Sequence, residues 1–295
     1  SCQLPTAFLA DGGPGVDGIP ALTDPEFVAA DDPRAAYVRD NDRVIGFRLG
    51  GEYRAVPLNI GWWHEVVNLQ AAGVQIAVTH CPLTGSSLVF DRSAADGATF
   101  GVSGVLFMNN LMLFDRREPA SLWPQMARGA RCGPRTGTAL QMLESIEMTW
   151  RGWRTLHPDT RVVSVATGHD RDYRAYPYGN YDVETNALLL GPNPALDTRR
   201  PPKERVLGIV RGGSAAVALP FGTLRARGAQ AVVMLRVGDA DVVVFWDGER
   251  EAAAAFLPRL GDTPLTFRVD GGRIVDDQTG STWSCLLYTS PSPRD

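Results

Sequence analysis

The feature that most constrains the fold is a set of five short segments that recur, in the same order, in the two halves of the chain. Each match is weak alone, but five matches in one order over about 80 residues indicate an internal repeat. The repeat predicts two similar lobes. The matching pairs are 43–51 with 205–213, 55–58 with 216–219, 78–90 with 233–245, 99–104 with 266–271 and 117–123 with 277–283.

Local patterns indicate that both copies consist mainly of strands. Apolar and β-branched runs flank Gly pairs, as in RVIGFRLGGEYRAVPL (residues 43–58), which predicts β-hairpins. Helical spacing is confined to short stretches: residues 59–70, which turn Trp63 and two valines toward a core, and residues 144–160. We expect an α+β, β-rich fold made of two duplicated β-rich lobes with a few short helices.

The repeat also divides the chain into segments. The last eleven residues (CLLYTSPSPRD) break off the strand-and-turn pattern and resemble a translated sequencing adapter, so we expect the second lobe to be truncated. The expected segments are an irregular arm (1–36), a first β-rich lobe (37–143), a helix-and-loop connector (144–203), a second, degenerate lobe (204–284) and the adapter-like end (285–295).

Charge and cysteine content narrow the classes of partner. The net charge is −4, so no basic surface suggests a nucleic acid. Apart from Cys285, the chain has Cys2, Cys81 and Cys132, an odd and sparse set for which no disulfide framework is expected. Cys2 precedes a polar, Pro- and Gly-rich segment, as a lipid-bearing Cys does in a bacterial lipoprotein; the alternative is a free Cys in a tail. We expect a periplasmic or extracellular protein whose only membrane contact is a lipid on Cys2.

The repeat helps to separate structural residues from functional ones. Residues shared by both copies are expected to serve the fold, and residues found only in the first copy are the candidates for chemistry. In the gapless match, Leu235 and Arg236 stand where the first copy has His80 and Cys81. The helix expected over 59–70 has no counterpart in the second copy. Candidate chemistry is therefore concentrated in the first lobe, at the strand end that carries His80 and Cys81.

One hypothesis makes Cys81 a nucleophile, which requires a neighbouring base. His80 is adjacent in sequence, but neighbours along a strand point to opposite faces. His64 is the better base, with Glu65 or Asn68 to orient it. The alternative is that Cys81 is a small buried apolar residue, as free Cys most often is.

A second hypothesis is a metal site. His64, His80 and Cys81 are ligand types that suit one copper or zinc ion, although their spacing matches no established metal motif. A small-molecule or anionic ligand is the third hypothesis. Arg92 and Arg116 could clamp an anion, and tyrosines of the loop 172–181 could line a cleft, although each has a structural alternative. The candidate binding residues are Asn68, Thr84, Ser86, Arg92, Arg116, Trp123 and Tyr178.

Several of these motifs together resemble one bacterial and archaeal family, the domain of unknown function three-one-seven-nine. They are GGPGVDGIPAL, WHEVVN, THCPLTGSSLVFD, GVSG, LMLFDRREPASLWPQ and TWRGWRTLHPDT, followed by the Tyr- and Pro-rich loop. The family pattern often reads Cys-Pro-Leu-Cys-Gly, and this chain has Thr84 in place of the second Cys. The resemblance implies a secreted or membrane-anchored globular protein.

Two functions follow as expectations. One is a cell-envelope protein that binds a metal or acts as a thiol-dependent enzyme, with its site at the corner formed by His80 and Cys81. The other is a non-catalytic envelope module that binds a small molecule or a protein partner in the cleft between the lobes.

Overall fold

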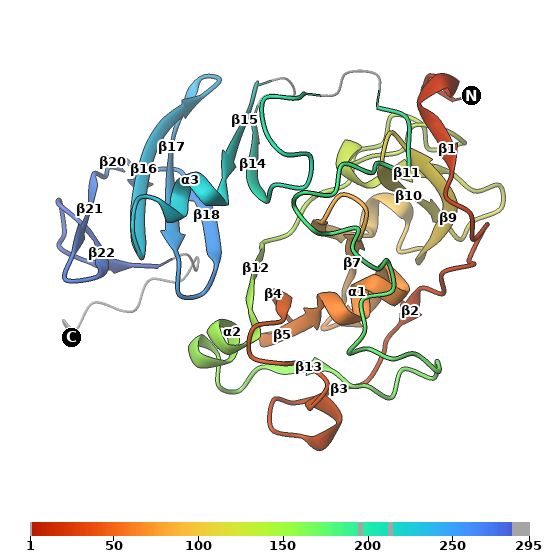
Figure 1. Cartoon of the computed structure of the whole chain (residues 1–295), viewed down its shortest axis with the longest axis horizontal. Helices are drawn as coiled ribbons and strands as arrows, with labels where there is room; N and C mark the ends of the chain where they lie inside the picture. Colours follow the sequence, from red (N-terminus) through yellow and green to blue (C-terminus); the bar gives the residue numbers. More distant parts are fainter. Residues whose placement is uncertain (1, 194–196, 212–214, 285–295) are drawn as a thin grey trace.

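The computed structural model describes residues 2–193, 197–211 and 215–284, and strands dominate it. Figure 1 shows two parts side by side, with β1–β13 on the right and β14–β23 on the left. The expectation of a β-rich fold with a few short helices is confirmed. The adapter-like end, residues 285–295, lies outside the described residues.

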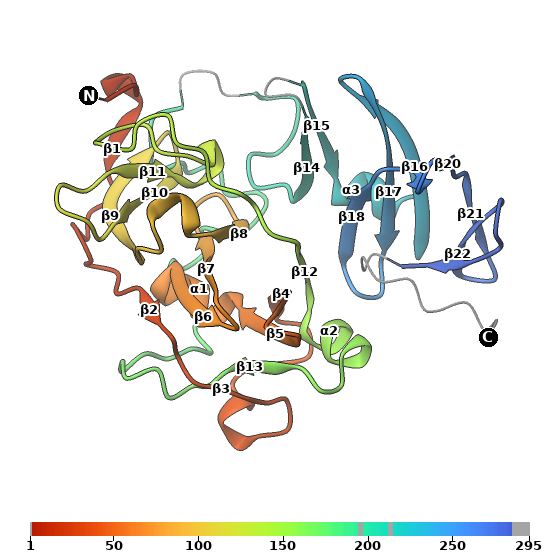
Figure 2. The ribbon, with the colours of Figure 1, turned by 180° about the vertical axis from the view of Figure 1, so that it is seen from behind.

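Three sheets are stacked in the first part, and Figure 2 shows the stack from behind. The outer five-stranded sheet has the order β12 (Ser145–Thr149), β4 (Arg43–Leu49), β5 (Glu52–Pro57), β13 (Arg161–Val163) and β3 (Phe27–Ala29). The middle sheet has the order β2 (Leu22–Thr23), β6 (Val66–Ala71), β7 (Val74–Cys81) and β8 (Ser86–Asp91). The third sheet has the order β1 (Leu9–Asp11), β9 (Phe100–Phe107), β10 (Asn110–Asp115) and β11 (Leu122–Pro124).

The middle sheet is buried on both faces. Ile76 and Val78 of β7 belong to the core shared with the five-stranded sheet, whereas Ala77 and Cys81 belong to the core shared with β9 and β10. Because successive side chains of a strand alternate between its faces, His80 and Cys81 serve different layers. This alternation is what separates the two most reactive side chains of the corner.

The helices are shorter than the sequence patterns predict. They are α1 (Leu58–His64), α2 (Trp150–Leu156) and α3 (Phe221–Arg225), with 3-10 turns at Thr6–Phe8, Pro33–Ala35, Ser93–Ala95 and Gln125–Ala127. The helix expected over 59–70 ends at His64, because Glu65 has φ +57° and β6 begins at Val66. The helix expected from 144 starts at Trp150, since residues 145–149 pair with β4 as β12 and Thr149 caps α2.

The second part repeats the element order of the first: a hairpin, a short helix and two meanders. The prediction that the first copy's helix has no counterpart is wrong, because α3 occupies that place. Its strands are β14 (Val206–Arg211), β15 (Ala215–Pro220), β16 (Gln230–Val237), β17 (Ala240–Asp247), β18 (Ala252–Phe256), β19 (Arg259–Leu260), β20 (Thr263–Pro264), β21 (Phe267–Asp270), β22 (Arg273–Asp276) and β23 (Thr282–Trp283).

One local arrangement occurs near the end of each of the two parts. Asp115 accepts hydrogen bonds from the N–H of Ser121 (2.9 Å) and the indole of Trp123 (3.0 Å). In the second part, Asp276 accepts the equivalent bonds from the N–H of Ser281 (3.1 Å) and the indole of Trp283 (2.8 Å). The two halves nevertheless form different sheets, since β14 and β15 stay a two-stranded sheet. Duplicated lobes therefore stay a prediction.

Element order also changes the internal comparison around Cys81. By order of elements β7 corresponds to β17, so Cys81 matches Asp247 rather than Arg236. The N–H of Thr84 donates to the Cys81 sulfur, and the N–H three residues after Asp247 donates to its carboxylate (3.1 Å). A thiol at the end of β7 and a carboxylate at the end of β17 thus each accept an N–H from the residue three positions later. Part of what Cys81 does is to cap a turn.

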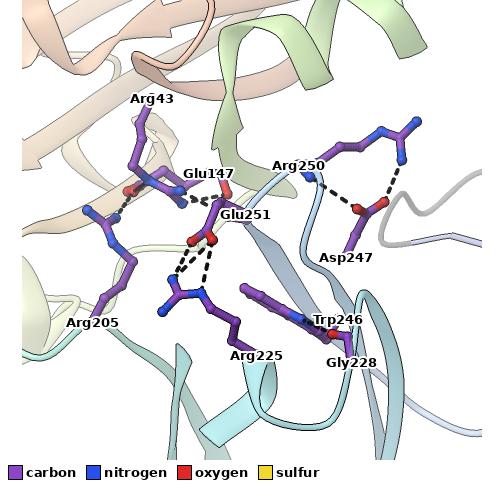
Figure 3. Close-up of polar contacts among 9 residues, drawn as sticks. All are labelled: Arg43, Glu147, Arg205, Arg225, Gly228, Trp246, Asp247, Arg250 and Glu251. Atoms are coloured by element: carbon purple, nitrogen blue, oxygen red, sulfur yellow. Dashed lines mark hydrogen bonds and ion pairs between the residues drawn. The ribbon is translucent and has the colours of Figure 1, made fainter. Parts of the chain in front are cut away.

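The two parts are joined by a shared core and by a polar junction (Figure 3). Val243, Phe245 and Ile274 of the second part belong to the same apolar core as the five-stranded sheet. At its edge, Glu147 of β12 pairs with Arg43 (2.6 Å) and with Arg205. Arg43 also donates to the carbonyl of Glu251 (2.9 Å). The junction therefore ties β4 and β12 to the second part.

Cys2 and Cys132 form a disulfide, although the odd and sparse cysteine set led us to expect no disulfide framework. The bond ties the N-terminal arm to the segment after β11, across 130 residues of sequence. Since its sulfur is engaged in this bond, Cys2 gives no support to the expected lipid anchor. None of the described helices has the length and apolar character needed to span a membrane.

Candidate functional site

Cys81 ends β7 with its side chain enclosed between the middle and third sheets, at 0% exposure. The sulfur accepts the N–H of Leu111 (3.3 Å), and the thiol faces the carbonyl of Asn109 at 3.9 Å. Burial raises the pKa of the Cys81 thiol, and the nearby charge of Glu65 raises it further. At neutral pH the group is therefore a thiol rather than a thiolate.

His64, the expected base, is engaged elsewhere. Its Nδ1 donates to the carbonyl of Pro20 (2.7 Å), and its Nε2 accepts the hydroxyl of Tyr173 (2.7 Å). Burial lowers its pKa to about 4, so the imidazole is neutral near pH 7. With both ring nitrogens occupied, His64 is not paired with Cys81.

Glu65 follows α1 in a left-handed conformation, which non-glycine residues adopt rarely. The residue is 7% exposed. Burial raises its pKa to about 8, so it is mostly protonated near pH 7. Its oxygens are not among the fully enclosed, unpartnered side-chain atoms of the described residues, so the carboxyl group keeps some contact with solvent.

Two tyrosines complete the surroundings of Glu65 and Cys81. Tyr178 donates its hydroxyl to the carbonyl of Trp62 (3.3 Å), and burial, followed by the charges of Glu65 and Cys81, raises its pKa. The hydroxyl of Tyr176 is buried without a partner in the described part of the chain, and its pKa is also raised, chiefly by burial. We call Glu65, Cys81, Tyr176 and Tyr178 the acid cluster, because all four are acids held in their neutral form.

His80 points to the opposite face of the middle sheet and belongs to the polar junction. Its Nδ1 donates to the hydroxyl of Ser87 (3.0 Å), which donates to Glu147 (2.8 Å). Burial lowers the pKa of His80 to about 4. Burial tends to raise the pKa of Glu147, but the charges of Arg43 and Arg205 outweigh this effect and lower the pKa to about 2. His80 is thus a structural neighbour of an ion-paired carboxylate.

The expected copper or zinc site is not supported. Within the described ranges no three His, Cys, Asp or Glu side chains are grouped so that they could hold a metal ion. His64, His80 and Cys81 make their contacts with three separate sets of partners, for the reasons given above.

The turn after Cys81 is held by a network of neutral side chains. Thr84 and Ser86 share a hydrogen bond (2.7 Å), and Ser86 donates to Gln125 (2.8 Å). Asn110 donates to Thr84 (3.0 Å) and to Gln125 (2.9 Å). Asn68 joins the middle and third sheets through both backbone groups of Phe100. These polar groups bond to one another, which favours a structural role for the turn.

Arg92 and Arg116 do not form a clamp. Arg92 is buried and donates to the carbonyls of Ile76 (3.0 Å), Gly97 (2.8 Å) and Leu69 (3.2 Å). Arg116 makes a two-pronged ion pair with Asp17. Trp123 is fully enclosed in the core. All three candidates are therefore occupied within the fold.

A pocket of about 230 Å³ lies beside the acid cluster. Tyr178 belongs to both, whereas Glu65 and Cys81 are not among the residues that line the pocket. Sequence patterns did not single out Trp62 and Arg171, although an adjacent pair of tryptophans after a strand was a visible signal. The lining residues are Gly18, Ile19, Pro20, Trp62, Trp63, Arg171, Pro177 and Tyr178.

Comparison with known proteins identifies one family. The model of that family, described as Protein of unknown function (DUF3179), matches residues 16–291. No curated protein and no solved structure matches the chain.

Proposed function

The chain belongs to the DUF3179 family, and we propose that it is a non-catalytic module of an extracytoplasmic compartment that binds a small organic molecule. The proposed site is the pocket formed by Trp62, Trp63 and Tyr178. The observation that carries the proposal is this pocket of about 230 Å³, which three aromatic side chains line. Ligand sites in proteins are typically concave and aromatic, with few polar groups.

A thiol-dependent enzyme is the weaker proposal. A nucleophilic Cys needs a thiolate, and a base or cation beside it supplies one. Cys81 has instead a carboxyl neighbour, Glu65, that opposes ionisation, and His64 is bonded to Pro20 and Tyr173. The chemistry of the corner therefore favours binding over attack.

The proposed compartment is supported by the bond between Cys2 and Cys132. Disulfides form and persist in oxidising surroundings such as the periplasm or the extracellular space. Peptide mapping of the protein as isolated from its own compartment, without reductant, is expected to recover the linked pair. Recovery of Cys2 as a free thiol would argue against this location.

Thiol labelling distinguishes the two functions. In a Cys285→Ser background, we expect native Cys81 to react with an alkylating reagent at least about a hundredfold more slowly than in urea, because the thiol is enclosed and protonated. The matched control is the same background with Cys81→Ser, which should show no slow phase. Rapid labelling of the native protein would restore the enzyme hypothesis.

Binding is tested with benzyl alcohol, an uncharged aromatic probe. We expect it to quench tryptophan fluorescence saturably, and we expect Trp62→Ala to remove the saturable component because a wall of the pocket is lost. Leu257→Ala, at an exposed position of the second part, is the control that should leave binding unchanged. Equal binding by both variants would exclude the pocket.

A further inference from the structure

Arg171 is the one charged side chain among the described residues that line the pocket. Its guanidinium lies over the ring of Trp63, with 5.5 Å between the guanidinium carbon and the ring centroid. Because Trp63 is itself a wall of the pocket, this contact places the charge of Arg171 at the pocket. A guanidinium stacked on an aromatic ring keeps the N–H groups in its own plane available for a ligand.

Most of the hydrogen-bonding capacity of Arg171 is unused by the protein. The side chain has five N–H donors, and Nη1 donates to the carbonyl of Asp170 (3.1 Å). In the described part of the chain no carboxylate forms an ion pair with Arg171. The neighbouring carboxylate of Asp172 accepts the N–H of Arg174 instead (3.0 Å). The charge of Arg171 is therefore available to an anion from outside the chain.

The other walls of the pocket suit a single apolar ring. They are aromatic rings, prolines, an isoleucine and a glycine, with no carboxylate and no side-chain amide. The indole of Trp63 donates to the carbonyl of Ala175 (3.3 Å), and the hydroxyl of Tyr178 donates to the carbonyl of Trp62 (3.3 Å). A cavity of about 150 Å³ can hold benzene, so about 230 Å³ is room for one ring with a small substituent.

The nearest acids do not repel an anion at neutral pH. Asp17, which precedes Gly18 of the pocket wall, pairs with Arg116. Glu65, in the acid cluster, is mostly protonated near pH 7, because burial raises its pKa to about 8. The positive charge of Arg171 is therefore the charge that a pocket ligand meets.

Deepening the proposed function, on which it rests, we propose that the ligand is a small aromatic carboxylate whose two oxygens bind Arg171 and whose ring lies against the aromatic walls. The planar guanidinium matches a carboxylate, since two parallel N–H groups can donate to its two oxygens. A cationic ligand would meet a like charge at Arg171, and no carboxylate lines the pocket to hold it.

Three probes that share one ring test the proposal: benzoate, benzyl alcohol and benzylamine, titrated by tryptophan fluorescence at pH 7 and constant ionic strength. Because Arg171 is exposed and partly screened by water, we expect benzoate to bind about three- to tenfold more tightly than the alcohol. The ammonium form of benzylamine should bind most weakly. Raising the ionic strength from about 0.05 M to about 0.5 M should remove most of the preference for benzoate.

Arg171→Gln should remove the difference between benzoate and benzyl alcohol. The matched control is Arg174→Gln, which removes the same charge from the same exposed loop. The Arg174 side chain donates to the carbonyl of Ala36 (3.2 Å) and does not line the pocket, so this variant should keep the preference for benzoate. Unchanged far-UV circular dichroism spectra check that both variants are folded.

The outcomes separate this proposal from the function on which it rests. Saturable binding of benzyl alcohol without a preference for benzoate would overturn the carboxylate and leave the pocket as a site for an uncharged ligand. A preference for benzylamine, or a preference for benzoate that survives in Arg171→Gln, would overturn the carboxylate as well. If none of the three probes binds, the proposed function fails and the carboxylate fails with it.

Discussion

Arg92 shows how a charged side chain can serve as scaffold. Its guanidinium is buried and donates to three backbone carbonyls, those of Leu69, Ile76 and Gly97. It thereby connects β6 and β7 to the turn that leads into β9. Arg116, by contrast, is paired with Asp17 at a partly exposed position near the surface, where ion pairs contribute about 0–1 kcal/mol.

Arg92→Ala is therefore expected to lower the free energy of unfolding by about 2–4 kcal/mol, because it leaves carbonyls unpaired in the interior. Arg116→Ala should lower it by less than about 1 kcal/mol. Urea unfolding followed by far-UV circular dichroism measures both. Equal losses in the two variants would contradict the structural role of Arg92.

Sequence reasoning at the residue scale recognised types of side chain but not their partners. It predicted that His80 and Cys81 would point apart, because strand alternation is a local rule. It could not foresee that His64 binds Tyr173, which lies 109 residues later. Partners of this kind are set by packing between distant segments, which a single sequence does not encode locally.

At the scale of elements, β12 connects the two parts of the molecule. Its Glu147 carboxylate holds Arg43 of β4 and Arg205, which leads into β14. Residues 144–149 were expected to be helical, yet they pair with β4 over five residues. Tertiary context overrides local helix propensity there, because pairing with β4 satisfies the backbone and Met148 is buried.

Glu147→Ala should lower the free energy of unfolding by about 2–4 kcal/mol, since it leaves Arg43 buried without its counter-charge. The lowered pKa of Glu147 contributes to the free energy of unfolding above pH 4.5, and this contribution is lost as the pH falls toward 2. Glu147→Gln should therefore remove this part of the pH dependence of stability. Glu251→Gln is the control, because that carboxylate meets exposed Arg225 and should matter by less than about 1 kcal/mol. Urea unfolding at pH 7 and pH 4 makes the comparison.

The whole molecule combines predictable and unpredictable features. The β-rich fold followed from strand patterns and turn residues, which are local signals. The apolar core shared by the two parts and the disulfide between Cys2 and Cys132 did not, because they join segments far apart in sequence. Family membership was recognisable from several separate motifs in a fixed order.

Replacing both Cys2 and Cys132 by Ser is expected to lower the free energy of unfolding by about 3–5 kcal/mol. The bond closes a loop of 130 residues, whose entropy in the unfolded chain would otherwise increase. Urea unfolding of the double variant, compared with the reduced native protein, measures this. The two should agree, and a double variant as stable as the oxidised native protein would contradict the assignment.

The enclosure of β7 on both faces limits how the family can change in length. Inserting or deleting one residue before His80 would move the imidazole into the apolar layer of Phe90 and Phe100 and turn Cys81 toward the ions of the junction. Side chains on both faces of β7 would then be misplaced, so repacking on one face could not offset the loss on the other. Natural variation in length should therefore be found at Gly50–Gly51 or Ala72–Gly73, where the chain turns at the surface, and be absent from β7.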